Sequence, residues 1–479
     1  MALVIWDTLR GGKYPFEPVQ RGKVGMYVCG MTVQARPHVG HMRSFVVADL
    51  MRRVFRARGY EVTLVQNFTD IDDKIIAKAN EAGRDYREFA EDNIRSYFQA
   101  ADWMGIERAT HYPRATDHIP EILAMIGDLI DKGHAYASGG DVFYDVTSKD
   151  DYGKLSRRRV DELRAGVRVD VDEDKRHPVD FALWKAAKPG EPAWDSPWGP
   201  GRPGWHIECS AMAVKLLGST LDLHGGGRDL VFPHHENELA QSEASTGCAF
   251  ARHWVESGLV NLGGQKMSKS TGIFFAMDDV MREIDPATLR LYFYSTHYRS
   301  PIEYGKVRLE ESRAARERVA NFLRAAAHAG GAGAKVERPA GLAGLDAEFA
   351  DAIDATAREF HEALDDDFNS AGALGKVFEL IRAGNQFLQA GATSPYYGAL
   401  LARARATVLE LGDLVGIDFA SGAPTAGSLP DEVQALVEQR EEARRGRDFA
   451  RADDLRARIR EAGWVVEDRP DGPLVKLAD

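Results

Sequence analysis

The sequence contains little cysteine, since only Cys29, Cys209 and Cys248 occur among 479 residues. Three cysteines cannot form a framework of disulfides, so we expect a reducing compartment and a cytoplasmic protein. Long apolar runs are missing too: no stretch approaches the roughly 18 apolar residues typical of a membrane span, and we expect no membrane partner. Basic charge is not in excess, because 61 Lys and Arg stand against 73 Asp and Glu, a net charge of −12. Any contact with nucleic acid must therefore come from a local basic face.

The first third of the sequence predicts an α/β fold. Residues 24–30 indicate a buried strand, residues 38–58 carry apolar side chains at helical spacing, and residues 61–66 indicate the next strand. A strand, a helix and a strand in this order form a βαβ unit, which implies a parallel sheet. Three later segments are predicted to continue the same sheet: residues 222–224, residues 230–232 with a helix starting at Pro233, and residues 253–262.

The middle of the chain has a different pattern. Residues 119–132 predict a helix, and a pair of strands is expected around Tyr136 and residues 142–144. The stretch from Trp184 to Trp205 contains four of the eight tryptophans and five prolines, which excludes a helix or a central strand. This stretch is either a rigid loop packed by its own indoles or a wall over a pocket.

Helical patterns dominate the last third. Residues 326–345 are rich in alanine, glycine and proline and predict a linker, and residues 421–430 predict a second one. The predicted helices are residues 349–364, 374–389, 397–414 and 432–462. The sequence thus predicts an α/β front part, a helical domain and a small C-terminal module.

A Pro-His-Val-Gly-His motif begins the helix predicted after the first strand. Pro37 is expected at the first helical position, with His38 and His41 on one face of the helix N-terminus. This end of a helix attracts phosphate, and Gly40 lets a flat ligand approach the backbone. Two histidines and a glycine near a helix start are also common for structural reasons, so the motif alone does not decide a function.

A second motif, Lys266-Met267-Ser268-Lys269-Ser270, follows two glycines. Its two lysines form a mobile positive clamp, which suits oxyanions in phosphoryl or nucleotidyl transfer. A solvated basic turn is the alternative when the motif is taken alone. Both motifs in one α/β domain rarely coincide by chance, and together they resemble the signature of the class I aminoacyl-tRNA synthetases.

The resemblance implies an ATP-dependent reaction. Members of this family activate an amino acid with ATP and Mg²⁺ and then esterify the 3′ end of a tRNA. The catalytic residues implied here, which would stabilise charge at the α-phosphate, are His38, His41, Lys266 and Lys269. The same residues, together with Gly40 and Ser268, would bind ATP. Adenylate formation is an in-line attack on phosphorus, so positioning and charge neutralisation carry the catalysis.

Two of the cysteines lie near other residues that bind metals. Cys29 ends the first predicted strand, and Cys209 lies in the segment Trp-His-Ile-Glu-Cys. His234 and Glu238 are expected one turn apart on one face of the helix starting at Pro233. Two thiolates, an imidazole and a carboxylate are ordinary zinc ligands, although a cysteine is often only a small buried hydrophobe. Further candidates nearby leave the ligand set open: His206, His224, His235 and Glu236.

The front part resembles the cysteinyl-tRNA synthetases, and the similarity extends from about residue 5 to about residue 470. The segments that carry it are Tyr27–Val33, Asn67–Lys74, Gly204–Met212, Gly225–Glu238 and His297–Ile302. The resemblance implies one Zn²⁺ per chain, which binds the substrate thiol directly as thiolate. The ligands implied are Cys29, Cys209, His234 and Glu238.

Binding of a thiolate by zinc explains how cysteine is distinguished from serine. Shape alone separates such near-isosteres by only about 10²-fold. A thiol has a pKa of about 8.5 and can bind a soft metal site as the anion, whereas a serine hydroxyl cannot ionise comparably. Because the metal supplies this discrimination and the middle insertion is short, we predict no editing activity.

Four further positions are assigned by the resemblance alone. Thr69, Trp205, His224 and Asp229 would lie around the amino acid. Trp205 is expected to wall off the pocket, and Asp229 to pair with the substrate ammonium. The neighbouring cluster of Asp70, Asp72 and Asp73 is expected to form a turn and a helix cap instead.

The C-terminal module carries local positive charge. The segment from Arg440 to Arg460 contains eight arginines and five acidic residues, a net of 8 − 5 = +3. Two sets of arginines are predicted to share helical faces: Arg444, Arg447 and Arg451, and Arg456 with Arg460. The helix is either salt-bridged in solvent or a face for tRNA phosphates. The resemblance implies a face for tRNA phosphates, within an anticodon-binding region.

Two other functions fit part of the sequence. An ATP-dependent cysteine ligase of the mycothiol type would share the zinc site and the adenylation step but would join cysteine to an amino sugar. The long helical part after Ala347 favours tRNA instead. A non-catalytic tRNA-binding paralogue is the other alternative, and the intact signature motifs argue against it. We therefore expect L-cysteine, ATP and tRNA(Cys) as substrates, and a monomer.

The expected fold class is α/β, with a Rossmann-type parallel-sheet catalytic domain, an inserted connective subdomain, an α-helical bundle and a small C-terminal anticodon-binding module. The expected boundaries are 1–118 and 204–262 for the halves of the catalytic domain, 119–203 for the insertion, 263–325 for the Lys-Met-Ser-Lys-Ser loop and stem-contact region, 346–416 for the tRNA-binding bundle, and 430–479 for the C-terminal module.

Overall fold

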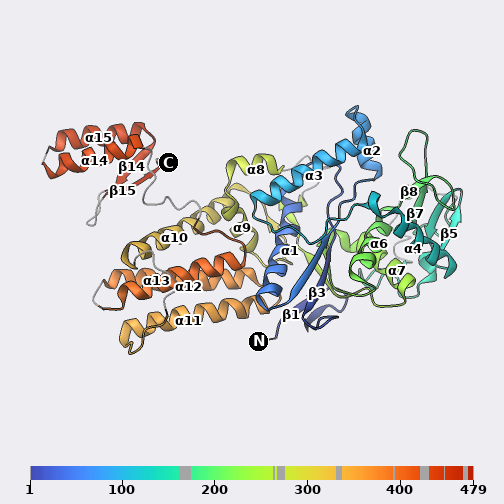
Figure 1. Ribbon diagram of the computed structural model, residues 1–479, viewed down its shortest axis with the longest axis horizontal. Helices are drawn as coiled ribbons and strands as arrows, with labels where there is room; N and C mark the ends of the chain where they lie inside the picture. The colour runs from blue at the N-terminus through green and yellow to red at the C-terminus, as the bar shows by residue number, and fades with distance from the viewer. Residues whose placement is uncertain are drawn as a thin grey trace. The chain divides into compact units, whose positions relative to one another are not determined.

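Figure 1 shows the computed structural model of the chain. It describes residues 2–160, 174–262, 265–266, 276–330, 337–391, 394–420, 431–446, 448–467 and 473–477. The chain divides into two compact units, Met1–Phe419 and Ala420–Asp479, and each is described by itself. Within the described ranges, no helix combines the length and the apolar content that crossing a membrane requires.

A parallel sheet of four strands forms the centre of the first unit, with the strand order β10-β9-β3-β4. The strands are β3 (Lys23–Val28), β4 (Glu61–Gln66), β9 (Leu221–Gly227) and β10 (Ala251–Ser257). Tyr27 of β3 stands opposite Val65 of β4 and His224 of β9. Helix α1 (Val39–Ala57) connects β3 to its parallel neighbour β4, so the predicted βαβ unit is confirmed.

Helices and short strands surround this sheet in the first unit (Figure 1). Before the insertion lie β1 (Val4–Asp7), β2 (Gly12–Pro15), α2 (Asp73–Glu81) and α3 (Tyr86–Trp103). After it lie α6 (Trp205–Leu217), α7 (Glu236–Thr246), α8 (Met277–Glu283), α9 (Pro286–Tyr294) and the sheet β12-β11-β13, made of Gln265–Lys266, Val260–Leu262 and Ile302–Glu303.

An antiparallel sheet and a helix form the segment inserted between α3 and α6. The elements are η1 (Ala115–His118), α4 (Ile119–Asp131), β5 (Ala135–Ser138), β6 (Asp141–Tyr144), η2 (Val146–Ser148), β7 (Phe181–Ala186) and β8 (Gly201–Pro203). Trp184 and Ile122 belong to its buried core. The Trp- and Pro-rich stretch is mainly loop, but the exclusion of a central strand and a helix is wrong at its two ends, since residues 184–186 belong to the interior strand β7 and Trp205 begins α6. Residues 201–203 form the edge strand β8, where Pro203 is tolerated because an edge strand leaves some N–H groups unpaired.

Four helices form a bundle in the first unit: α10 (Lys306–Gly330), α11 (Gly344–Asp365), α12 (Ser370–Ala390) and α13 (Tyr397–Leu414). The rings of Phe349 and Phe387 are stacked between α11 and α12, with centroids 4.5 Å apart. The linker predicted from residue 326 starts too early, because residues 326–330 form the last turn of α10. Alanines in that stretch are strong helix formers and continue the helix.

The second unit contains α14 (Asp431–Arg445), α15 (Phe449–Glu461) and the antiparallel pair β14 (Trp464–Glu467) and β15 (Leu474–Leu477). Its own apolar core includes Leu436, Leu455 and Ile459. The prediction of one helix over 432–462 is wrong, because a turn at Gly446 ends α14. Asp448 then caps α15 by accepting a hydrogen bond from the N–H of Arg451 at 3.1 Å. The predicted linker at 421–430 lies outside the described residues.

Two details near the sheet also differ from the prediction. Residues 230–232 are not a strand but belong to the 3₁₀ turn η3 (Arg228–Leu230) and the wider π-type turn η4 (Val231–His235), within which Phe232 alone is extended. Helix α7 begins at Glu236 rather than at Pro233. The end of the predicted strand 253–262 belongs to the separate sheet of β11. A short apolar run does not distinguish a strand from a helical turn, which explains the first difference.

Candidate functional site

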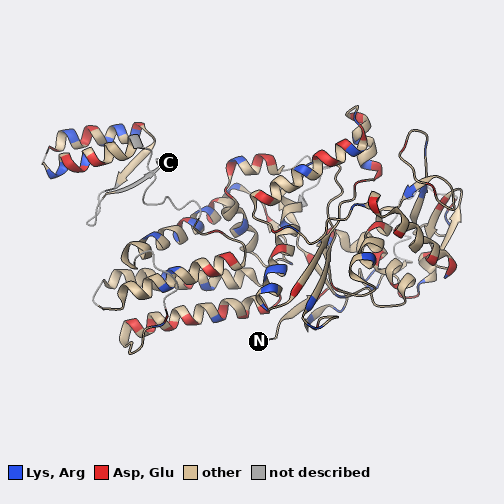
Figure 2. Ribbon diagram, in the orientation of Figure 1, with Lys and Arg blue, Asp and Glu red and all other residues tan. Residues whose placement is uncertain are grey.

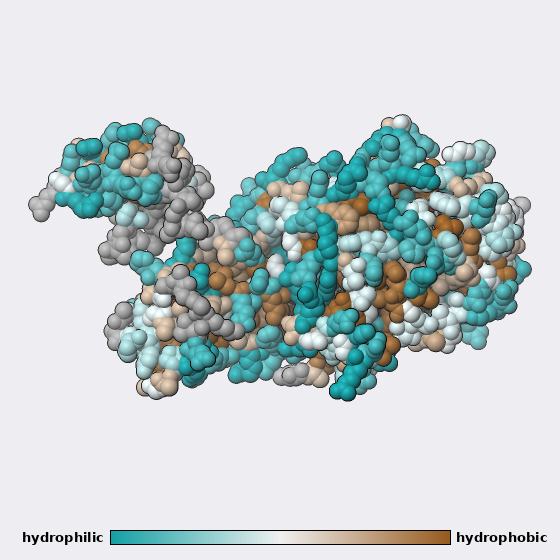
Figure 3. Space-filling model, in the orientation of Figure 1, coloured by the Kyte–Doolittle hydropathy of each residue, from teal (hydrophilic) through white to brown (hydrophobic). Residues whose placement is uncertain are grey.

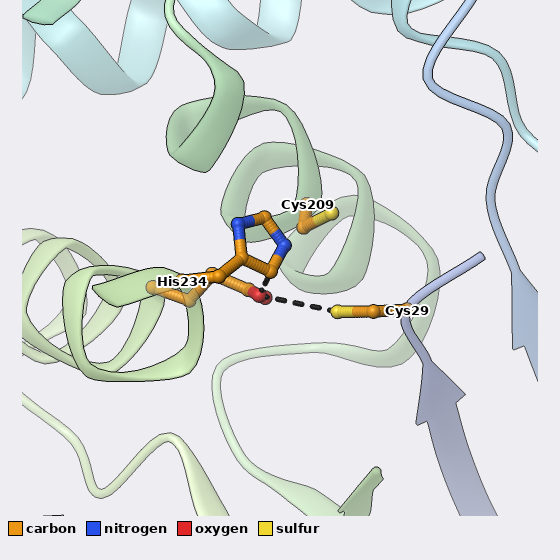
Figure 4. Close-up of side chains that lie close together, drawn as sticks. Cys29, Cys209 and His234 are labelled. Atoms are coloured by element: carbon orange, nitrogen blue, oxygen red, sulfur yellow. Dashed lines mark hydrogen bonds and ion pairs between the residues drawn. The ribbon is translucent and has the colours of Figure 1, made fainter. Parts of the chain in front are cut away.

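Four potential metal ligands converge below the surface at the carboxyl end of β3. Cys29 directly follows β3, Cys209 lies on α6, His234 lies in the turn η4, and Glu238 lies in the first turn of α7. Their ligand atoms all lie within 4.8 Å of one another, and all four residues are buried. Figure 4 shows Cys29, Cys209 and His234 pointing toward the same space.

Hydrogen bonds hold the four side chains together. Oε1 of Glu238 lies 3.2 Å from Sγ of Cys29 and 2.9 Å from Nε2 of His234. Burial disfavours the Glu238 carboxylate, but His224 and His234 outweigh this and hold its pKa well below the usual range. Burial also disfavours protonated His234, yet Glu238 and Cys209 raise its pKa to about 10. The cluster therefore stabilises both an anion and a cation within one buried space.

The two thiols differ in acidity. Burial raises the pKa of Cys29 well above its usual value, and its hydrogen bond with Cys209 adds to this rise. Burial acts in the same direction on Cys209, but the hydrogen bond from Cys29 and the neighbouring His234 lower its pKa to about 6. Cys209 is therefore the more acidic of the two thiols.

The donor set fits a zinc ion. Zinc bonds of about 2.0–2.3 Å place neighbouring ligands of a tetrahedral site about 3.3–3.8 Å apart. The separations in this cluster are comparable, at 2.9 Å and 3.2 Å around Oε1 of Glu238 and at most 4.8 Å overall. The second oxygen of Glu238, Oε2, accepts a hydrogen bond from Nε2 of His224 at 2.8 Å and leaves Oε1 facing the cluster. Nδ1 of His206 similarly lies 2.8 Å from Nδ1 of His234 and leaves Nε2 facing the cluster. Such outer partners orient metal ligands.

Some of the competing candidates have other partners. Nδ1 of His235 lies 3.0 Å from Glu256. Both oxygens of Glu236 accept backbone N–H groups, from Gly153 at 2.9 Å and Ser156 at 2.7 Å. A second group of donors within metal-binding distance is Cys29, His224 and His235. It shares Cys29 with the first group and contains one ligand fewer.

His38 and His41 form a paired structure at the start of α1. His38 is the N-cap, and its Nδ1 accepts the N–H of His41 at 3.2 Å, while Nδ1 of His41 lies 3.4 Å from the N–H of His38. The two rings are stacked, with centroids 3.5 Å apart. Acceptance at Nδ1 places the proton of a neutral imidazole on Nε2, so each ring is a donor at Nε2.

Two neighbours of this pair fix its position. A Cβ atom at Gly40 would lie 3.0 Å from Cε1 of His38, so glycine leaves the room that the His38 ring occupies. Pro37 precedes the N-cap and is not the first helical residue as predicted, because His38 takes the cap itself. The carbonyl of Pro37 accepts the N–H of Met277, which brings α8 against the motif.

The second motif is described only in part. The backbone of Gln265–Lys266 forms β12, which pairs with β11, so Lys266 lies at the end of this small sheet. Ser268 and Lys269 lie outside the described residues. After them, Ala276 forms a β-bridge with His38, so the chain returns from the second motif directly to the first.

Three of the four proposed amino-acid pocket residues lie close to the cluster. The ring of Trp205 stacks on His234 with centroids 4.3 Å apart, and His224 contacts Glu238. The Thr69 hydroxyl donates to Oε2 of Glu208 at 3.0 Å. Sequence reasoning did not single out Glu208, whose only signal was its position beside Cys209; burial raises its pKa well above the usual range.

The remaining acidic candidates are more exposed or structural. Asp229 is exposed in η3, close behind β9. Asp72 is the N-cap of α2, and its carboxylate accepts the N–H of Lys74 at 2.9 Å. Asp70 accepts the N–H and the hydroxyl of Thr116. The expected turn and cap are therefore present in the described chain.

The arginines of the second unit do not share one helix. Arg444 lies on α14 and Arg451 on α15, while Arg447 lies outside the described residues. Arg440 is buried and pairs with Glu441 at 2.7 Å, so it is no part of a solvent-facing stripe. Figures 2 and 3 show basic and acidic residues on both helices and a largely hydrophilic visible surface over the described part of this unit.

Comparisons with known families cover most of the chain. Residues 15–314 match the family described as tRNA synthetases class I (C) catalytic domain. Residues 359–420 match the DALR domain, and residues 426–473 match the cysteinyl-tRNA ligase anticodon binding domain.

Full-length relatives extend this similarity. The chain is 46% identical over 492 residues to a cysteine–tRNA ligase of Trichlorobacter lovleyi and 47% identical over 485 residues to one of Heliobacterium modesticaldum, and each match covers 100% of both chains. Among solved structures, methionyl-tRNA synthetase of Mycobacterium tuberculosis in complex with methionyl-adenylate is similar with a TM-score of 0.64 at 14% identity, covering 86% of this chain and 95% of that one. That likeness establishes the class I synthetase fold.

Proposed function

The chain belongs to the cysteine–tRNA ligase family of the class I aminoacyl-tRNA synthetases, and we propose that it activates L-cysteine with ATP and transfers it to the 3′ end of tRNA(Cys). The observation that supports this substrate best is the buried cluster of two thiols, an imidazole and a carboxylate. Its first member, Cys29, precedes the His38 motif by nine residues in the chain. The match of residues 426–473 to an anticodon-binding domain favours tRNA over an amino sugar as the acceptor.

Zinc is the metal that suits this cluster, with one ion held per chain by Cys29, Cys209, His234 and Glu238. When bound, the ion would supply a borderline-soft Lewis acid able to hold the sulfur of the substrate as a thiolate. His224 and His206 orient the ligands Glu238 and His234 through their hydrogen bonds. Serine is rejected because its hydroxyl does not ionise at neutral pH and its oxygen is a poorer ligand beside two thiolates.

The amino-acid pocket lies around this cluster. Trp205, stacked on His234, walls one side and excludes water from the ligands. Thr69 is fixed by its hydrogen bond to Glu208, and His224 lies behind Glu238. Asp229 is assigned to the substrate ammonium, whose charge pairs with a carboxylate at the exposed end of the pocket.

Charge at the α-phosphate is neutralised by the two signature motifs. His38 and His41 each donate at Nε2, and both rings are held by the N-terminal turn of α1, where the helix dipole also favours phosphate. Lys266 and Lys269 complete the positive environment, with Ser268 and Gly40 against the nucleotide. The cysteine carboxylate attacks the α-phosphorus of ATP, which is bound with Mg²⁺, and pyrophosphate leaves in line.

The remaining parts of the chain are assigned to the tRNA. Residues 1–118 and 204–262 are proposed as the catalytic domain, 119–203 as the connective insertion, 263–325 as the signature-loop and stem-contact region, 346–416 as the tRNA-binding bundle, and 430–479 as the anticodon-binding module. We propose a monomer that acts in the cytoplasm, where tRNA is charged for translation.

Three measurements on one preparation test this function. The purified chain should contain one zinc, should catalyse ATP–pyrophosphate exchange with cysteine but not with serine, and should charge tRNA(Cys). Exchange without charging would favour the amino-sugar ligase, and neither reaction would favour a tRNA-binding paralogue. Full cysteine selectivity after complete removal of the metal would reject the role of zinc.

A further inference from the structure

The turn formed by residues 297–300, which follows α9, contacts three separate parts of the first unit: the helical bundle, helix α1 and the strand that leads to the second signature motif. We propose that this turn positions the two signature motifs, and that Asp367 of the helical bundle is the positioning residue that fixes the turn. The inference rests on the roles proposed above for His38, His41 and Lys266.

Asp367 lies between α11 and α12, and its carboxylate is fully buried. Oδ1 accepts the N–H of Trp6 at 2.9 Å and the hydroxyl of Tyr298 at 2.8 Å. Oδ2 accepts Nε of Arg299 at 2.7 Å. This carboxylate therefore holds two consecutive residues of the 297–300 turn by charge-assisted hydrogen bonds, the strong class of such bonds.

The backbone at this point is strained, which is unusual for a mere connection between helices. Asp367 and the next residue, Phe368, have φ of 60° and 52°, both in the left-handed region although neither is glycine. Side chains other than glycine rarely adopt this region, and such a residue persists only where its surroundings dictate it. The conformation aims the carboxylate at the 297–300 turn and places the Phe368 ring 5.7 Å from Phe55 of α1.

On its other side, the turn is bound by α1. The guanidinium of Arg43, two residues after His41, donates to the carbonyls of Ser300 at 2.6 Å and Gly258 at 2.8 Å. It also donates to the carbonyl of Leu259 at 2.9 Å. Arg43 is buried, so one side chain of the helix that carries the first motif fixes both the 297–300 turn and the segment 258–259.

The turn and the segment 258–259 are also bonded directly. The N–H of Gly258 donates to the carbonyl of Tyr298 at 2.7 Å, and a Cβ at Gly258 would lie 2.2 Å from the carbonyl oxygen of Ser300, so only glycine fits. Residues 260–262 then form β11, which pairs with β12 and so leads to Lys266. A continuous set of short contacts thus joins Asp367 to both motifs.

The alternative is that Asp367 only fastens the bundle to the rest of the unit. The neighbouring Asp366 provides a matched control, because its carboxylate forms an ion pair with Lys13 at 2.5 Å. Within the described chain, its side chain makes no hydrogen bond or ion pair with residues 297–300. Asp367→Asn suits the test because asparagine adopts the left-handed region readily and keeps the size of the side chain. The substitution therefore removes the charge and leaves the backbone.

The experiment measures cysteine-dependent ATP–pyrophosphate exchange by the full chain without tRNA, a reaction in which the bundle takes no direct part. We expect Asp367→Asn to lower kcat about tenfold with little change in KM for ATP or cysteine, since small misplacements in a positioned site cost up to about 10²-fold. Asp366→Asn should retain the wild-type kcat. Hydrogen exchange at the amides of residues 258–262 should rise in Asp367→Asn and stay at its wild-type rate in Asp366→Asn.

Two further variants remove the dependence on one substitution. Arg299→Gln breaks the same link from a partly exposed side chain and should reproduce the loss even if Asp367→Asn is unstable. Arg43→Lys combined with Asp367→Asn should lower kcat by less than the product of the single effects, because both act through one turn. A wild-type kcat and unchanged amide exchange in folded Asp367→Asn or Arg299→Gln would overturn the proposal. Absence of exchange activity in the wild-type chain would reject the proposed function instead, while the amide exchange would still test the link.

Discussion

The rings of His38 and His41 are stacked 3.5 Å apart at the start of α1, and Nδ1 of His38 accepts the N–H of His41. The pair therefore caps the helix with one set of nitrogens and keeps the other set as donors. In the function proposed for the chain, this double use connects the stability of the helix start with the binding of a phosphate.

Replacement of His38 by asparagine separates these two uses. Asparagine is a good N-cap, so α1 should still begin at Val39, but the Nε2 donor is lost. We expect kcat for ATP–pyrophosphate exchange to fall by about 10²-fold, as for the loss of one donor to transition-state charge. Thermal denaturation should show a Tm within a few degrees of wild type. A variant with an unchanged kcat would contradict the role proposed for His38.

Replacement of Cys29 by serine tests the metal cluster. The substitution exchanges a thiolate for a poor zinc ligand, so we expect loss of bound zinc and a fall in the ratio of cysteine to serine activation. Plasma emission spectrometry and exchange assays with both amino acids measure these effects. Cys248→Ser is the matched control, because Cys248 is exposed and belongs to neither group of candidate ligands in the described chain. Equal zinc content in both variants would remove Cys29 from the ligand set.

Deletion of residues 421–479 tests the C-terminal module. This unit has its own apolar core, so the rest of the chain should fold without it. We expect the KM for tRNA to rise by about tenfold or more and to depend less steeply on salt, because phosphate contacts are lost. Cysteine-dependent exchange should stay at its wild-type rate. A parallel loss of exchange and charging would mean that the module supports the catalytic fold rather than the tRNA.

The buried His253 of β10 gives a pH dependence of stability. Burial, reinforced by the nearby Arg10, lowers its pKa to about 4, so the folded chain keeps this ring neutral while the unfolded chain protonates it with a pKa of about 6.5. Its contribution to stability is therefore complete above about pH 6.5 and falls by about 1.4 kcal/mol per pH unit as the pH drops toward 4. Between pH 7.5 and 5, the Tm of wild type should decrease more than that of His253→Gln. The exposed His328, changed to glutamine, is the control for the loss of a histidine.

Much of the local structure was legible in the sequence. Apolar residues at helical spacing gave α13 its bounds, Tyr397–Leu414, and the run Glu61–Gln66 gave β4, because periodicity depends on neighbouring residues alone. The ends of helices were predicted less well. The apolar pattern predicted one helix through Gly446, but the chain turns there, since the local preference for helix yields to the packing of α14 on α15. The two signature motifs could also be recognised from the sequence, because the residues of each motif are adjacent in the chain.

The sequence by itself determined the residue types of the cluster and the βαβ unit that carries its first member. Only the tertiary structure decided that Cys29, Cys209, His234 and Glu238 meet within 4.8 Å, and that Glu236 turns instead to the backbone of Gly153 and Ser156. It also decided that Asp367 reaches the 297–300 turn from the bundle. These contacts depend on the packing of elements that are far apart in the chain, which a local pattern of residues does not encode.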